Sequence, residues 1–315
     1  MLSPSLGLCT FTPPLATDIP VPCLLSIVMS TTSPKEEHRS GLPLVPRQTS
    51  LEIIREMEAA CAVRDLPRFK SIFDTWTSLN LDIHDLDSVM IQAIRQDQKD
   101  VVAELLQQGL TMSQDYALEA IRHKSKDVLN ILLQHGWDIN QPTSELRPPA
   151  LGYAVDDDEM TLWLLDHGAD PNKQCSIDLT PLSYAVEQAS LPTVKLLLDR
   201  GGDVHKGQLL HHAVERRMDT IEVLDMLLKR GAPLNSKMYE KHYSSWRLYY
   251  FMGLGTALHK AAELGKADVV RYLIDQGADV GIKDATNRSA MDWAALNNHQ
   301  EIVELLQSVE RRHRL

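Results

Sequence analysis

The chain has 315 residues, of which 43% are hydrophobic and 24% are charged, as is ordinary for a globular protein. Its formal net charge of -11 and its pI of about 5.5 exclude a large, uniformly basic surface, so general nucleic-acid binding is not expected. No two of the four cysteines form a CxxC pair, and no Cys and His residues show zinc-ligand spacing, which indicates free thiols in a reducing compartment.

The first fifty residues are rich in residues that oppose a packed core. Residues 1–50 contain 8 of the 16 prolines together with 13 Ser and Thr residues, so we expect a disordered tail. Met29 begins "MSTTSPKEEHRS", which is similar to an ordinary protein start, and residues 1–28 would then be an upstream extension. The apolar run at residues 21–29 is too short to span a bilayer, and no Lys or Arg precedes Lys35. These features predict a cytoplasmic or nuclear protein that does not bind membranes.

From residue 51 to residue 309 the chain repeats one pattern. An end signal such as "LLQQG" or "LIDQG" recurs, and its glycines stand at positions 109, 136, 168, 201, 231 and 277. A period near thirty residues is the signature of a stacked repeat protein. Each unit also contains an alanine that allows two helices to approach closely: Ala60, Ala93, Ala120, Ala154, Ala185, Ala213, Ala261 and Ala294.

Each unit is predicted to contain two helices. Short polar residues are expected to cap the first helix: Ser88, Asp115, Thr180, Thr256 and Ser289. The second helix has apolar residues on one side, as in "VVRYLI" at 269–274. The glycine then ends that helix, because a left-handed backbone conformation costs a residue with a Cβ atom more.

The stretch "TALHKAAELG" at 256–265 resembles an ankyrin repeat, whose hallmark is T-P-L-H-x-A over about 33 residues. The match is specific around Thr180 and Thr256 and weaker elsewhere. The resemblance implies an all-α ankyrin-repeat solenoid of about eight helix–turn–helix units with short hairpin-like turns over residues 51–309. The polar sequence "QSVERRHRL" at the end predicts a polar C-terminal tail at 310–315. It also implies that His211 and His259, at the fourth position of the motif, bond across the turn.

In ankyrin-type stacks the first helices line a concave face, so exposed positions there can recognise a partner. The residue before the repeated alanine is such a position, and it reads Gln92, Glu119, Tyr153, Tyr184, His212, Lys260 and Trp293. Tyr and Trp are favoured anchors in protein interfaces. Of these, we predict partner binding by Tyr153, Tyr184, His212, Lys260 and Trp293. The alternative is that Tyr153 and Tyr184 only pack against neighbouring helices.

The largest departure from the period lies between Gly231 and Gly277, where the spacing of 46 residues exceeds a normal repeat by 13. The excess falls at residues 237–253, which hold 6 of the 17 aromatic residues and a local charge of +2. Insertions between repeats often lie on the binding face. Binding of an apolar, acidic peptide is predicted for Tyr239, Tyr243, Trp246, Arg247 and Tyr249. The alternative is a loop that fills its own small core.

Catalytic and metal-binding patterns are missing from the sequence. It contains no nucleophile elbow, phosphate-binding loop, dinucleotide fingerprint or HExxH motif. The acidic run at 156–159 lacks the loop pattern of a calcium site and indicates a solvated turn. We therefore expect neither an enzyme, nor a cofactor, nor a bound metal.

These observations predict a monomeric, non-catalytic scaffold that binds another protein through the concave face and the insertion at 237–253. One alternative is an adaptor or regulatory subunit that delivers a client to an enzyme such as a ubiquitin ligase, with a docking motif in the tail. Another is an enzyme whose site lies in the insertion, although that stretch offers only Glu240, His242, tyrosines and cations.

Overall fold

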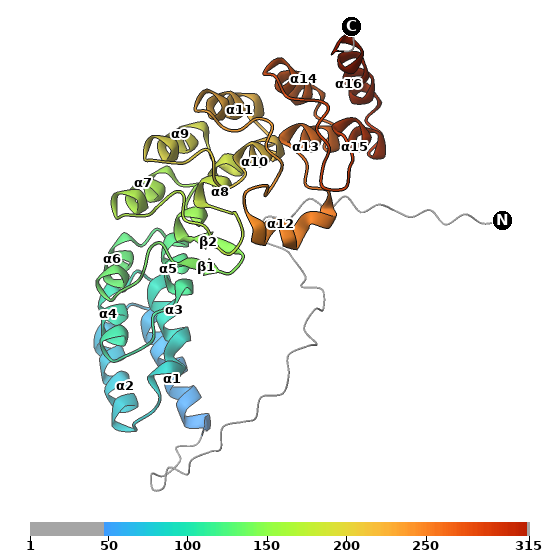
Figure 1. Ribbon diagram of the computed structural model, residues 1–315. Helices are drawn as coiled ribbons and strands as arrows, with labels where there is room; N and C mark the ends of the chain where they lie inside the picture. Colours follow the sequence, from blue (N-terminus) through green and yellow to red (C-terminus); the bar gives the residue numbers. More distant parts are fainter. Residues whose placement is uncertain (1–46, 314–315) are drawn as a thin grey trace, which may run out of the picture. The chain divides into compact units, whose positions relative to one another are not determined.

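The computed structural model describes residues 47–313 (Figure 1). The tail predicted for residues 1–50 lies outside the described residues except for its last four, and these four belong to α1 (Arg47–Ala62). The helical region therefore begins before the predicted boundary. At the other end α16 (Gln300–His313) includes most of the predicted polar tail at 310–315. None of the described helices is both long and apolar enough to cross a membrane.

Most of the chain consists of successive helix pairs, which confirms the predicted all-α solenoid. The pairs are α1 with α2 (Leu66–Ser78), α3 (Asp87–Arg95) with α4 (Lys99–Gln107), α5 (Gln114–Arg122) with α6 (Lys126–Gln134), α8 (Pro181–Gln188) with α9 (Leu191–Asp199), α10 (Leu209–Glu215) with α11 (Thr220–Lys229), α13 (Ala257–Glu263) with α14 (Ala267–Asp275), and α15 (Ala290–Leu296) with α16. A short 3-10 turn, η1 (Ile83–Leu86), precedes α3.

The pairs stack in two rows (Figure 1). The first elements of the units contact one another in the order α1, α3, α5, η2 (Ala150–Tyr153), α8, α10, α13 and α15. In the second row α4 contacts α6, α11 contacts α14, and α14 contacts α16. The eight repeated alanines are all buried, none of them more than 2% exposed. The core therefore runs between the rows, and a larger side chain at these positions would push the helices apart.

Side-chain caps begin three first helices at predicted residues. Thr180, Thr256 and Ser289 each form a reciprocal capping box, with Ser183, His259 and Asp292 respectively. Two other predicted caps are wrong. Helix α3 begins one residue before Ser88, and Ser113 rather than Asp115 caps α5.

Glycine ends six of the second helices as predicted. The six glycines have φ between +87° and +97°, and a Cβ atom on any of them would meet nothing within 4 Å. The backbone conformation, rather than space, therefore selects glycine at these positions.

Asparagine side chains couple consecutive repeats. The Asn172 amide nitrogen donates to the carbonyl oxygen of Gly201 at 2.8 Å, and its amide oxygen accepts from the backbone N–H of Asp203 at 2.7 Å. Asn140 makes the equivalent two bonds one repeat earlier. These three consecutive turns are thus tied to one another.

The array departs from the regular pattern in two places. Before α7 (Asp158–Asp166) the first helix is reduced to η2, which follows a two-stranded hairpin of β1 (Pro142–Ser144) and β2 (Arg147–Pro149). Prolines in β2 lack the N–H groups that a longer helix would need. The insertion forms α12 (Tyr243–Tyr249) and η3 (Tyr250–Met252), which lie outside both rows on the side of the first helices (Figure 1).

Candidate functional site

One side of the insertion packs against the repeats. Tyr239 is 8% exposed, and its ring stacks on that of Tyr249 with centroids 5.7 Å apart. Ser245 of α12 is fully buried, and its hydroxyl oxygen accepts from the backbone N–H of Asp178 at 3.0 Å. The predicted binding residues Tyr239 and Tyr249 therefore contribute mainly to the attachment of the insertion.

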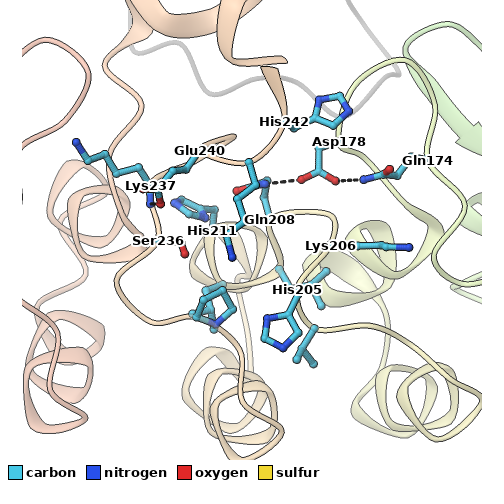
Figure 2. Close-up of a pocket in the computed structure, with 15 residues that line it drawn as sticks. Gln174, Asp178, His205, Lys206, Gln208, His211, Ser236, Lys237, Glu240 and His242 are labelled. Carbon is cyan, nitrogen blue, oxygen red and sulfur yellow. Dashed lines mark hydrogen bonds between the residues drawn. The ribbon is translucent and has the colours of Figure 1, made fainter. Parts of the chain in front are cut away.

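Asp178 is the centre of this attachment. Its carboxylate accepts hydrogen bonds from the backbone N–H of Gly207 at 2.9 Å and from the side-chain amides of Gln174 and Gln208 (Figure 2). The other end of the Gln208 amide accepts from the backbone N–H of Tyr239 at 3.1 Å. The turn before α8, the turn before α10 and the insertion are thus held in one network.

A second attachment lies where the insertion returns to the repeats. The carbonyl oxygen of Gly255 accepts from the backbone N–H of Met238 at 2.8 Å and lies 3.0 Å from Nε2 of His211. Burial lowers the pKa of His211 to about 4, so the imidazole is neutral at pH 7 and donates through Nε2. His259 makes the corresponding contact, with Nε2 at 3.2 Å from the carbonyl oxygen of Arg288. Both histidines bond across a turn.

Titration of His211 should lower the free energy of unfolding by about 2 kcal/mol when the pH falls from about 7.5 to about 5. The pKa is about 4 in the folded protein against 6.5 for an unperturbed histidine, so the unfolded chain binds more protons between these values. This stability is present above pH 6.5 and is lost as the pH falls toward 4. Urea unfolding of His211→Gln should show a pH dependence that is smaller by that amount.

His205→Gln is the matched control, because His205 is exposed and lies in the turn just before α10. Because this side chain is exposed, its replacement should change the pH dependence less than His211→Gln does. A His211→Gln protein with the wild-type pH dependence would contradict the neutral, buried state of this ring.

The other side of the insertion is exposed and aromatic. Of the twelve exposed large hydrophobic residues in the described chain, five lie between residues 243 and 251. Tyr243, Trp246 and Tyr250 are spaced three and four residues apart, which places them on one side of a helix. The ring centroid of Trp246 is 6.3 Å from that of Tyr243 and 5.6 Å from that of Tyr250, and Tyr250 contacts Phe251. We call these four residues the aromatic face.

The exposed fractions show how much of this surface is free. Tyr243 is 70% exposed, Phe251 66%, Tyr250 50% and Trp246 41%, and Arg247 beside them is also exposed. Single exposed apolar residues are common, whereas a contiguous patch marks an interaction site. The attached inner side holds this patch in place before any partner arrives.

A cavity of about 250 Å³ lies at the base of the insertion (Figure 2). Its lining comes from the turn before α8, the turn before α10, α10 itself and the start of the insertion. The basic residues among its lining are Lys206, Lys237, Lys241, His205, His211 and His242. Lys206 and His205 were not among the predicted site residues, because they precede the insertion by about thirty residues and only the fold brings them beside it.

The predicted positions on the first helices are largely covered by contacts within the chain. Tyr184 is 6% exposed, and its ring lies 5.9 Å from that of Tyr153. Trp293 donates through Nε1 to Asp284 at 2.9 Å, and the guanidinium of Arg288 lies 4.4 Å above its ring. These side chains therefore present less free surface than the aromatic face.

A chain of charged groups crosses α8, α10 and α13. Nδ1 of His212 is 3.0 Å from Glu187 and 3.8 Å from Glu215, and the ammonium of Lys260 is 3.0 Å from Glu215 and 3.3 Å from Glu263. Burial alone would lower the pKa of His212, but the Glu187 hydrogen bond and the charges of both carboxylates outweigh it and raise the pKa. His212 and Lys260 were predicted as binding residues, but their ion pairs with Glu187 and Glu215 were not, since these partners come from different repeats.

Two carboxylates and an imidazole of this chain lie close enough together to hold a metal ion: those of Glu187, Glu215 and His212. The Lys260 ammonium already lies against the Glu215 carboxylate and supplies positive charge there. We therefore describe the group as an ionic network that ties neighbouring repeats together.

Comparison with known proteins identifies the repeats. The family model for ankyrin repeats (3 copies) matches residues 150–238 and 248–312. These two ranges consist of ankyrin repeats. The nine residues between the matched ranges lie inside the insertion, so most of α12 lies outside the matched repeats.

Several proteins with ankyrin repeats resemble part of the chain. It is 32% identical over 146 residues to the ankyrin repeat protein nuc-2 of Neurospora crassa, covering 45% of this chain and 13% of the relative. It is 33% identical over 115 residues to the mouse B-cell lymphoma 3 protein homolog, covering 35% and 22%. A match of 38% over 56 residues to a probable E3 ubiquitin-protein ligase of rice, XBOS33, covers 18% and 11%. The chain thus spans less than a quarter of each of these relatives.

Proposed function

We propose that this ankyrin repeat chain is a non-catalytic scaffold that binds another protein, with the aromatic face as the main contact. The observation that carries the proposal is the contiguous exposure of four aromatic side chains on a segment attached to the repeats. A surface that is ordered before binding loses less conformational freedom when the partner arrives. Ankyrin repeats act in general as protein-interaction modules, which supports the same function.

The adjoining first-helix row forms the second part of the proposed surface. Tyr153, Tyr184, His212, Lys260 and Trp293 lie on its successive elements and would contact the partner through whatever surface their own packing leaves free. We expect Tyr243, Trp246 and Arg247 to contribute more to partner binding than these five residues, because the side chains of the three are exposed. Tyr239 and Tyr249 would support the surface from beneath.

Replacing Trp246 and Tyr250 together by Ala should weaken partner binding tenfold or more. Interface aromatics of this kind contribute at least about 1 kcal/mol each when they are truncated. Quantitative affinity capture from native lysate, followed by a binding titration with the captured partner, measures the loss. Trp246 and Tyr250 are exposed, so helicity measured by circular dichroism should not change.

The matched control is Leu162→Ala, which removes an exposed apolar side chain from α7 in the other row of helices. Tyr249→Ala is less suitable as a test, because its ring packs on Tyr239 and its loss would also loosen the insertion. A double variant that binds every partner as tightly as Leu162→Ala does would overturn the proposal.

We further propose that the chain acts as a monomer in the cytoplasm or the nucleus, without binding nucleic acid or membranes and without enzymatic activity. The net charge of -11 supports the absence of nucleic-acid binding, and the buried free thiols of Cys61 and Cys175 fit a reducing compartment.

A second candidate is an adaptor that delivers a client to an enzyme such as a ubiquitin ligase. The match to a probable E3 ubiquitin-protein ligase favours it. The capture experiment separates the two functions when it is repeated with a chain that begins at Arg47, the first residue of α1. An adaptor with a docking motif in residues 1–46 would keep its client and lose the enzyme, whereas a simple scaffold would keep all partners.

A further inference from the structure

We propose that the cavity at the base of the insertion receives a carboxylate side chain of the partner, so that the partner segment is an acidic peptide with apolar side chains. The inference rests on the proposed function, because the same segment would place its apolar side chains on the aromatic face. It adds a second, electrostatic subsite and the residues that form it.

The lysines around the cavity are available to an acidic partner. Lys206, Lys237 and Lys241 make no ion pair with any carboxylate of the described chain, whereas Lys260 is paired with two. Lys206 and Lys241 are exposed, and Lys237 is half-buried. Their ammonium groups are therefore free to pair with an acidic group from outside.

The two acidic residues of the cavity accept hydrogen bonds from the protein itself. Both oxygens of Asp178 accept hydrogen bonds, from a backbone N–H and two side-chain amides (Figure 2). The carboxylate of Glu240 accepts from the backbone N–H of Lys237 at 3.3 Å. Asp178 therefore points its oxygens at donors of the wall, whereas Glu240 is exposed and bonds to the backbone of the insertion through one oxygen.

Acidic residues are distributed unevenly along the chain. No Asp or Glu occurs between Glu240 and Glu263, although the whole chain has a net charge of -11. The insertion is therefore a locally positive region on an acidic protein. An acidic peptide would be attracted to this region and repelled by much of the remaining surface, which favours one docking position.

The cavity and the aromatic face follow one another directly along the chain. Lys241 and His242 line the cavity and directly precede Tyr243, the first residue of α12. At about 1.5 Å per residue, the helix carries the face about 10 Å from Tyr243 to Tyr250. An extended peptide covers that distance with about three residues at roughly 3.3 Å each. One short segment can therefore reach both subsites.

The size of the cavity is suitable for this role. A volume of about 250 Å³ accommodates a carboxylate side chain together with several water molecules, each of which takes about 30 Å³. Lysine ammonium groups and the two outer histidines, His205 and His242, offer N–H donors to such a group (Figure 2).

The test selects binding peptides from a displayed library of random twelve-residue sequences, with the full chain as target. The same selection is run on Lys206→Glu/Lys241→Glu, on Trp246→Ala/Tyr250→Ala and on a charge control, Lys70→Glu/Lys195→Glu. The control changes the net charge equally at exposed positions on α2 and α9. Selected peptides are then titrated by fluorescence anisotropy at low and at high salt.

We expect peptides selected on the wild type to combine Asp or Glu with apolar residues and to bind less tightly at high salt. The cavity variant should bind them roughly tenfold more weakly, since two attractive charge pairs become repulsive, and the control variant should bind them as the wild type does. Peptides that need Trp246 and Tyr250 but show no acidic preference would overturn this inference and leave the proposed function standing. If no selected peptide depends on Trp246 and Tyr250, both proposals fail.

Discussion

Asp178→Ala should lower the free energy of unfolding by about 4 kcal/mol and should release the insertion from the repeats. The carboxylate accepts from three N–H donors, those of Gly207, Gln174 and Gln208, and a charged acceptor makes each bond stronger than a neutral one. Asp178 itself is only 4% exposed, so donors that lose it would gain little from water.

Urea unfolding measures the stability loss, and amide hydrogen exchange at Met238 and Tyr239 measures the release of the insertion. Asp170→Ala is the control, because Asp170 is exposed and accepts one local bond, from Asn172. The control should lose less than about 1 kcal/mol. Equal losses for the two variants would show that the network around Asp178 does not hold the site together.

Asp178→Asn tests the same hydrogen-bond network with almost no change in side-chain shape. Asparagine keeps one oxygen that accepts from Gly207. Its NH₂ group, however, faces the NH₂ group of Gln208, and two donors cannot bond to each other. Gln208 then either leaves its donor unpaired or flips and loses its bond from the backbone of Tyr239. Exchange at Tyr239 should therefore accelerate even though the change is nearly isosteric.

Arg216→Ala should also lower the free energy of unfolding by about 4 kcal/mol. Arg216 follows α10, is 5% exposed, and donates to the carbonyl oxygens of Val186 at 2.7 Å and Ala189 at 2.8 Å. These carbonyls end α8 in the preceding repeat and have no helical donor of their own, so the guanidinium caps that helix. Burial lowers the pKa of Arg216, but the group stays charged.

Arg200→Ala is the matched control for this second change. Arg200 is exposed and pairs with Asp166 at 2.7 Å, so its loss should cost less than about 1 kcal/mol. Arg216→Met keeps most of the side-chain volume and should still cost about 3 kcal/mol, because the carbonyls remain without a donor. A methionine variant as stable as the wild type in urea would show that Arg216 acts by packing alone.

The repeat architecture could be predicted from the sequence because its signals are local. Each glycine that ends a second helix, from Gly109 to Gly277, is required by the backbone conformation of that one residue. The capping boxes at Thr180, Thr256 and Ser289 each join two residues three positions apart. The buried alanines could be predicted because they recur at the spacing of the repeats. Cap prediction failed at Asp115, where a serine two residues earlier offered the same chemistry.

The two sides of the insertion were decided only by the tertiary structure. Its composition predicted an aromatic binding segment, but Tyr239 and Ser245 turn inward. Gln208, 31 residues away in the chain, holds Tyr239, and Asp178, 67 residues away, holds Ser245. Trp246 is left outside as a consequence of the same attachment. The cavity with Lys206 likewise exists only where stacking places the turn before α10 beside the insertion. A sequence pattern reports contacts along one helix or turn, whereas these groups meet across repeats.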